Sequence, residues 1–202
     1  GYNVFLLDYS VGKDAGGLEP LKEASDAIVK IRTHATSWLC DPNRICVLGF
    51  SAGGHVAASV SLLYGNPVLG DREDQMNRPD ACVLCYPVVT TGSFCHEESV
   101  EWVSGGDPKL KELLSLENQV SDGVPPFFIW HTVGDQAVPV ENSLLLACAL
   151  RKHSIPFELH LFQEGDHGLS MCNEEVGTPQ EADKAWVGLC DTWLQRQFDY
   201  AR

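Results

Sequence analysis

Residues 49–53 read GFSAG and follow a short apolar run, so Ser51 stands between two glycines. A G-x-S-x-G segment that joins a strand to a helix holds its serine in a sharp turn and exposes the hydroxyl. The helix that follows points its N-terminus at the serine, where the Ala52 amide can donate to an oxyanion. The pattern predicts that Ser51 is a nucleophile and Ala52 an oxyanion-hole residue. The alternative is a glycine-rich turn with an incidental serine.

A serine hydroxyl needs a base to take its proton and an acid to orient that base. Asp135 follows the apolar run 126–131, and His167 lies in the glycine-flanked loop 163–168 after a second run at 157–162. Ser, Asp, His is one of the chain orders in which this triad occurs. We therefore expect His167 to be the general base and Asp135 the acid that orients it.

Three other histidines could compete with His167 for the role of base. His131 ends a predicted strand, just before the loop of Asp135, so we expect a structural, hydrogen-bonded role for it. His160 lies within a predicted strand, and His55 lies in the first helical turn after the serine. Packing or hydrogen bonding suits both of them better than catalysis.

Two further carboxyl groups, Asp166 and Glu164, could replace Asp135 as the acid. Both are close to His167 in the sequence, but neighbours within one loop rarely hold the imidazole from the correct side. We therefore favour Asp135.

Short apolar runs alternate with amphipathic segments, which is typical of strands alternating with helices. We expect strands at 2–7, 44–49, 81–86, 126–131 and 157–162, and helices at 20–39, 140–152 and about 179–197, with another beginning at 55–60. The run at 44–48 predicts a strand buried on both faces. This order predicts an α/β fold with a mostly parallel sheet, helices on both faces and right-handed crossovers.

The connection between the third and fourth predicted strands, residues 88–125, contains Trp102 and a short helix near 109–114. We expect it to form a cap or lid that covers the active site and shapes its substrate pocket. Residues 65–79 are polar and could line the rim. The chain as a whole, 1–202, is expected to be a single domain.

The formal net charge of −14, with 44% hydrophobic and 21% charged residues, indicates an acidic globular domain. Such a charge disfavours nucleic acid and anionic membranes as partners and favours a neutral or cationic substrate only weakly. The nucleophile pattern makes a small-molecule ester the expected partner. No run of about 18 apolar residues is present, so no membrane span is predicted.

Several of the eight cysteines lie inside predicted strands or helices, which is typical of buried thiols in a reducing cytoplasm. Cys82 and Cys85 have the spacing of metal ligands. They lie within one predicted strand and have no second ligand pair, so we expect neither a metal nor a cofactor.

The chain resembles the α/β-hydrolase superfamily, and within it the small bacterial carbohydrate esterases of the acetyl-xylan-esterase-like and hormone-sensitive-lipase-like kinds. The matching segments are residues 7–9, 49–55, 125–131, 134–143 and 165–168. The resemblance implies an α/β-hydrolase fold with Ser51 as nucleophile, Asp135 orienting, and His167 as base and then acid. It also implies that the Ala52 amide is an oxyanion donor.

One part of the family pattern is absent from the sequence. These enzymes begin with two or three strands and a His-Gly-Gly-Gly type loop that supplies further oxyanion donors, ahead of the strand that residues 2–7 resemble. No glycine pair in this chain follows a histidine, and the chain begins at Gly1. We therefore expect an N-terminally truncated α/β-hydrolase domain, in which the lost donors would reduce activity.

The expected function is hydrolysis of short-chain carboxylic esters through an acyl-enzyme, with acetyl groups on sugars or xylo-oligosaccharides as the substrate that the resemblance implies. One alternative is a serine peptidase of the prolyl-oligopeptidase type. The other is an inactive hydrolase fragment or binding scaffold.

Overall fold

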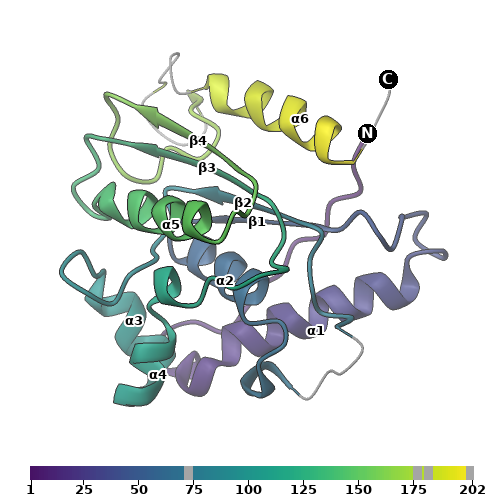
Figure 1. The fold of residues 1–202 in the computed structure, drawn as a ribbon, viewed down its shortest axis with the longest axis horizontal. Helices are drawn as coiled ribbons and strands as arrows, with labels where there is room; N and C mark the ends of the chain where they lie inside the picture. Colours follow the sequence, from purple (N-terminus) through teal and green to yellow (C-terminus); the bar gives the residue numbers. More distant parts are fainter. Residues whose placement is uncertain (71–74, 175–178, 180–183, 199–202) are drawn as a thin grey trace.

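A computed structural model describes residues 1–70, 75–174, 179 and 184–198 of the chain. Its centre is a parallel sheet of four strands in the order β1-β2-β3-β4 (Figure 1). The strands are Cys46–Phe50, Ala81–Cys85, Phe127–Thr132 and Phe157–Phe162. Strands β2 and β3 are buried along their whole length, because they lie inside the sheet and both of its faces are covered.

Helices cover both faces of the sheet (Figure 1). The helices α1 (Glu19–His34), α2 (Ser51–Leu62) and α5 (Glu141–Lys152) lie on one side, and α6 (Ala185–Gln197) lies on the other. Alternate residues of β3 enter the two resulting cores: Phe127 and Ile129 the first, Phe128 and Trp130 the second. The period of two along a strand explains this division. The predicted α/β fold, with helices on both faces, is confirmed.

The connection between β2 and β3 is largely helical. It contains α3 (Glu97–Ser104), α4 (Pro108–Leu113) and the 3-10 turn η4 (Leu116–Asn118). The other 3-10 turns are η1 (Gly12–Asp14), η2 (Gly16–Leu18) and η3 (Pro67–Leu69). The sequence predicted α4 but missed α3, which spans only eight residues and starts without a side-chain cap.

The strand expected at 2–7 does not form. Residues 1–11 have no regular secondary structure, and Val4 and Leu6 are 86% and 97% exposed. Instead of pairing with a strand, this segment is tied to the loop after α1, where the Asn3 side chain donates to the carbonyl of Leu39 over 3.1 Å. An apolar run becomes a strand only where a neighbouring strand takes its backbone hydrogen bonds, and the described residues supply none here.

The expectation that the strand at 44–48 is buried on both faces is also wrong. Strand β1 is at the edge of the sheet, and Leu48 is 47% exposed. Helix α6 packs mainly against β2 and β3 and reaches β1 where Trp186 meets Phe50 edge to face, so Leu48 is only partly covered.

Most other boundaries agree with the prediction to within a few residues. Strand β4 and helix α5 match closely, whereas α1 ends at His34 because residues 35–40 form turns. Helix α6 begins at Ala185. The predicted helical residues 180–183 lie outside the described part of the chain.

The parallel sheet brings the predicted site residues to one edge. Ser51 directly follows β1, Asp135 lies in the loop after β3, and His167 lies in the loop after β4. In parallel sheets the carboxyl ends of the strands share an edge, and the loops there form the usual ligand site.

Gly49 is the position where the β1-to-α2 turn tolerates no side chain. A Cβ added there would lie 2.1 Å from the carbonyl oxygen and 2.5 Å from the carbonyl carbon of Gly53. We expect Gly49→Ala to lower the free energy of unfolding by about 3 kcal/mol, because backbone rather than a movable side chain is in the way. Urea unfolding followed by circular dichroism measures this.

Gly188→Ala is the matched control. Gly188 is exposed on α6, and a Cβ there has no atom within 4 Å. This substitution should leave stability unchanged or raise it by up to about 1 kcal/mol. Equal effects of the two substitutions would contradict the close approach of Gly49 to Gly53.

Candidate active site

Ser51 occupies a strained turn between β1 and α2. Its backbone angle φ is +52°, a value that residues other than glycine rarely adopt. The neighbouring backbone holds this conformation, because the Val88 amide donates to the Ser51 carbonyl over 3.2 Å. Gly54 packs so closely on Pro87 that an added Cβ would lie 2.9 Å from the proline Cβ. Backbone strain at a partly buried serine that packing holds on two sides is typical of functional residues.

Two hydrogen bonds connect Ser51, His167 and Asp135 in sequence. The Ser51 Oγ lies 2.7 Å from His167 Nε2, and His167 Nδ1 lies 2.6 Å from Asp135 Oδ2. Because a carboxylate only accepts, Nδ1 carries the proton, and Nε2 is left to accept from the serine hydroxyl. The geometry thus brings together the three residues that the sequence singled out.

The Asp135 carboxylate is fixed by four donors. Its Oδ1 accepts from the amides of Ala137 and Val138, each over 2.9 Å, and its Oδ2 accepts from His131 Nε2 as well as from His167. Burial by itself would raise the pKa of Asp135, but the hydrogen bonds from His131, His167 and the Val138 amide outweigh burial and lower it. Asp135 is therefore ionised, and its negative charge faces His167.

His131 does not contact Ser51, and it is fully buried. Its Nε2 lies 3.2 Å from Asp135 Oδ2 and 3.0 Å from the Val138 carbonyl, while its Nδ1 lies 2.8 Å from Ser143 Oγ. Two acceptors at Nε2 place the proton on that nitrogen, so Nδ1 accepts from the serine hydroxyl. The hydrogen-bonded role predicted for His131 is confirmed, but spacing along the chain did not indicate that Asp135 is its partner.

The loop of His167 is joined to the loop of Asp135. Gly165 and Gly168 flank the histidine with φ of +128° and +84°, which glycine adopts without strain. The Thr132 hydroxyl donates to the Gly165 carbonyl over 2.9 Å, linking the end of β3 to the loop after β4. His167 and Asp135 are therefore held at a fixed separation.

Tyr86 contacts His167 and was not singled out by the sequence. Its ring meets the His167 ring edge to face, with 5.0 Å between centroids, and its hydroxyl accepts from the Ser170 amide over 2.9 Å. Burial raises the pKa of Tyr86 to about 12, so the phenol stays neutral. Its position directly after β2, at the edge that carries Ser51, is the signal that could have singled it out.

The competing residues have other partners. His55 is buried and lies 3.0 Å from the Leu114 carbonyl through Nε2, and His160 pairs with Glu158 over 2.9 Å. Both nitrogens of His167 are taken by Ser51 and Asp135, so neither is left for Asp166 or Glu164.

Ala52 is in the first turn of α2, whose amides have no intrahelical acceptor. No side chain caps this end of the helix. The Ala52 amide is therefore available to an anion formed beside Ser51, as the helix N-terminus favours.

No group of histidine, cysteine and carboxylate side chains in the described residues is arranged to hold a metal ion. Cys82 and Cys85 are buried in β2, and burial raises the pKa of the Cys82 thiol to about 12 and that of Cys85 well above its usual value. Among the described helices, none is both long and apolar enough to cross a membrane.

Comparison with known proteins agrees with the fold. The parallel sheet, the strained serine after β1 and the aspartate and histidine after β3 and β4 define an α/β-hydrolase. The chain belongs to the BD-FAE family, whose model matches residues 1–150.

Two relatives of known sequence are similar over most of the chain. Endo-1,4-beta-xylanase B of Butyrivibrio fibrisolvens is 41% identical over 182 residues, which are 87% of this chain and 29% of that protein. Acetylxylan esterase of Xylanibacter ruminicola is 30% identical over 156 residues, 74% of this chain and 31% of that protein. The chain thus spans about a third of the length of the curated relatives it matches.

Two solved structures resemble the whole fold. An acetyl ester-xyloside bifunctional hydrolase from Caldicellulosiruptor lactoaceticus superposes with a TM-score of 0.84 at 41% identity, covering 96% of this chain and 71% of that one. A carboxylesterase from Lactobacillus plantarum gives a TM-score of 0.83 at 28% identity, covering 96% and 74%. The predicted resemblance to carbohydrate esterases of the α/β-hydrolase type is confirmed.

The lowered pKa of Asp135 predicts a pH-dependent contribution to stability. A group whose pKa is lower in the folded state stabilises the fold above its unfolded pKa, about 3.9 for aspartate, and this contribution is lost as the pH falls through the folded value. We therefore expect the difference in unfolding free energy between the wild type and Asp135→Asn to be smaller at pH 3 than at pH 5.

Urea unfolding at the two pH values measures that difference. Asp122→Asn is the control, because Asp122 is 94% exposed and should give a difference close to zero at both. A difference for Asp135→Asn that grows toward pH 3 would contradict the hydrogen-bond network around the carboxylate.

Proposed function

We propose that this protein hydrolyses esters of short carboxylic acids through an acyl-enzyme formed on Ser51. The observation that carries the proposal is the pair of hydrogen bonds from Ser51 to His167 and from His167 to Asp135. A hydroxyl, an imidazole and a buried carboxylate in this order are the arrangement that activates a serine for acyl transfer.

The proposed reaction proceeds in two steps. His167 Nε2 takes the Ser51 proton as Oγ attacks the ester carbonyl, and the Ala52 amide stabilises the negative charge on the carbonyl oxygen. His167 then gives the proton to the departing alcohol, and a water molecule repeats the sequence on the acyl-enzyme. Asp135 keeps the proton on Nδ1 and stabilises the imidazolium that forms in both steps.

The names of the relatives support an ester of a sugar as the substrate. One relative is an acetylxylan esterase, and one solved neighbour is an acetyl ester-xyloside hydrolase. The xylanase name belongs to a protein of which this chain matches only 29%. Cleavage of a glycosidic bond requires a pair of carboxylates, whereas the site around Ser51 presents one carboxylate behind an imidazole. Acetyl esters of xylo-oligosaccharides are the substrates we propose.

Ser51→Ala should abolish hydrolysis of p-nitrophenyl acetate and of acetylated xylo-oligosaccharide, and Asp135→Asn should lower kcat by about 10⁴-fold. Steady-state kinetics on the folded variants measures both effects. Ser93→Ala is the control, since Ser93 lies in the exposed loop after β2. Activity that survives Ser51→Ala would overturn the proposal, and no activity in the folded wild type would favour a binding scaffold.

His131 should affect the pH profile rather than substrate binding. It shares Asp135 Oδ2 with His167, so removing its N–H leaves that oxygen more basic and favours the imidazolium of His167. In the plot of kcat/KM against pH, we expect His131→Leu to move the acidic limb to higher pH. His131→Gln keeps a hydrogen-bond donor and should move this limb less. An unchanged limb in a folded His131→Leu variant would show that the histidine only packs.

A further inference from the structure

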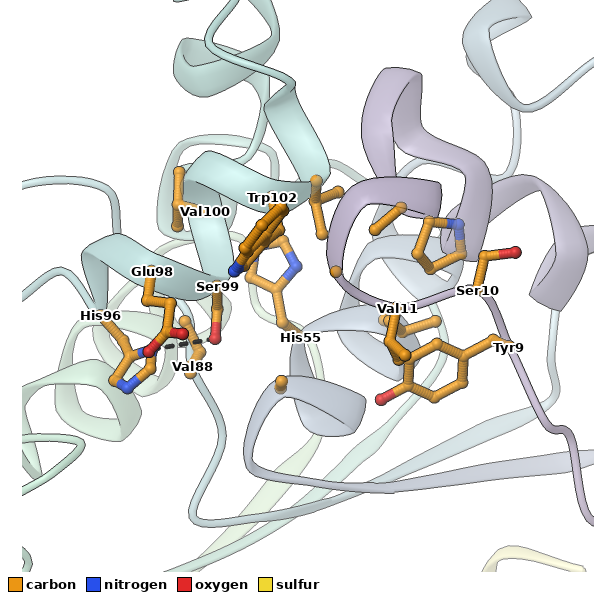
Figure 2. Close-up of a pocket in the computed structure, with 16 residues that line it drawn as sticks. Tyr9, Ser10, Val11, His55, Val88, His96, Glu98, Ser99, Val100 and Trp102 are labelled. Carbon is orange, nitrogen blue, oxygen red and sulfur yellow. Dashed lines mark hydrogen bonds between the residues drawn. The ribbon is translucent and has the colours of Figure 1, made fainter.

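A cavity of about 230 Å³ lies beside the N-terminus of α2. Its walls come from the chain between Tyr9 and Pro20, from the start of α2 and from α3. Figure 2 shows Tyr9 and Val11 on one side of the cavity and His96 and Trp102 on the other. Ala52, the residue after the serine, also lines it, so the cavity adjoins the reacting atoms.

The cavity is formed by other parts of the chain than the loops that carry Asp135 and His167. Within the described part of the chain, no residue of the loops that carry Asp135 and His167 lines the cavity. The carbon under attack has four substituents: the serine oxygen, the oxyanion, the departing alcohol and the acyl group. The alcohol must lie within reach of His167, which protonates it, and the oxyanion faces the Ala52 amide. Of the two organic parts of the ester, the alcohol is thereby assigned to the side of His167, and the cavity beside Ala52 is left for the acyl group.

The size of the cavity exceeds what an acetyl group needs. A cavity of about 150 Å³ accommodates benzene, whereas the apolar part of an acetyl group is a single methyl. At about 230 Å³ the space accepts at least six carbon atoms.

The lining of the cavity is mostly apolar. Val11, Val88, Val100 and Trp102 contribute to its walls, and Trp102 is 46% exposed, so much of its surface is available to a ligand. A hydroxyl-rich sugar ring would lose hydrogen bonds with water against such walls, whereas an alkyl or ring-shaped acyl group would lose none. Each buried methylene should increase affinity by about fourfold.

We propose that this cavity is the acyl pocket, that it takes an apolar acyl group of about six carbons, and that Trp102 is the residue that determines acyl size. The proposal rests on the esterase function proposed above and extends its acyl range beyond acetyl. The sugar alcohol then occupies the opposite side, next to His167.

Kinetics on p-nitrophenyl acetate, butanoate and hexanoate test the pocket. We expect the wild type to have a kcat/KM for hexanoate at least about threefold above that for acetate. Trp102→Ala should lower the hexanoate-to-acetate ratio by about tenfold, because it removes the largest apolar wall. Leu144→Ala is the control, since Leu144 is 39% exposed on α5 and does not line the cavity; the ratio should not change.

A second variant tests the pocket independently in case Trp102→Ala does not fold. Val11 is 68% exposed at the cavity, and Val11→Trp should fill it and lower the same ratio. A wild type that prefers acetate, or a ratio that neither variant changes, overturns the acyl pocket while Ser51-dependent hydrolysis of acetate still supports the esterase. Absence of Ser51-dependent hydrolysis of every ester overturns both proposals.

Discussion

The close approach of Gly49 to Gly53 is the constraint on which the site depends. With no side chain at Gly49, the end of β1 can turn directly into α2, and Ser51 is forced to a φ of +52° at the top of the turn. The same turn places the Ala52 amide at the start of the helix, free of any side-chain cap. One backbone contact thus sets both the exposure of the hydroxyl and the direction of the helix N-terminus.

A second set of contacts fixes Asp135 and His167 relative to each other. The Asp135 carboxylate is buried and accepts four hydrogen bonds, and the loop of His167 is joined to β3 through Thr132 and Gly165. A buried charge is tolerated only when it is paired and hydrogen-bonded, so this network must form for the loops to fold. Its members therefore serve stability and the proposed catalysis together.

The surroundings of Ser51 are divided between two halves of the fold. The loops after β3 and β4 carry Asp135 and His167, whereas the cavity lies between the N-terminal segment, α2 and α3. In the proposed reaction, this division separates the reacting residues from α3 and residues 9–20, which line the proposed acyl pocket. Surface loops and short helices tolerate variation better than buried strands do.

The sequence by itself determined the α/β alternation and the positions of Ser51, Asp135 and His167, because these depend on local patterns: apolar runs, glycines and turn residues. Only the tertiary structure decided that residues 2–7 find no partner strand, that β1 is an edge strand, and that His131 and Tyr86 contact Asp135 and His167. Each of these features depends on which other segment of the chain packs beside the residues concerned. Burial, edge position and the identity of a hydrogen-bond partner are set by packing across the sheet, which spacing along the chain does not specify.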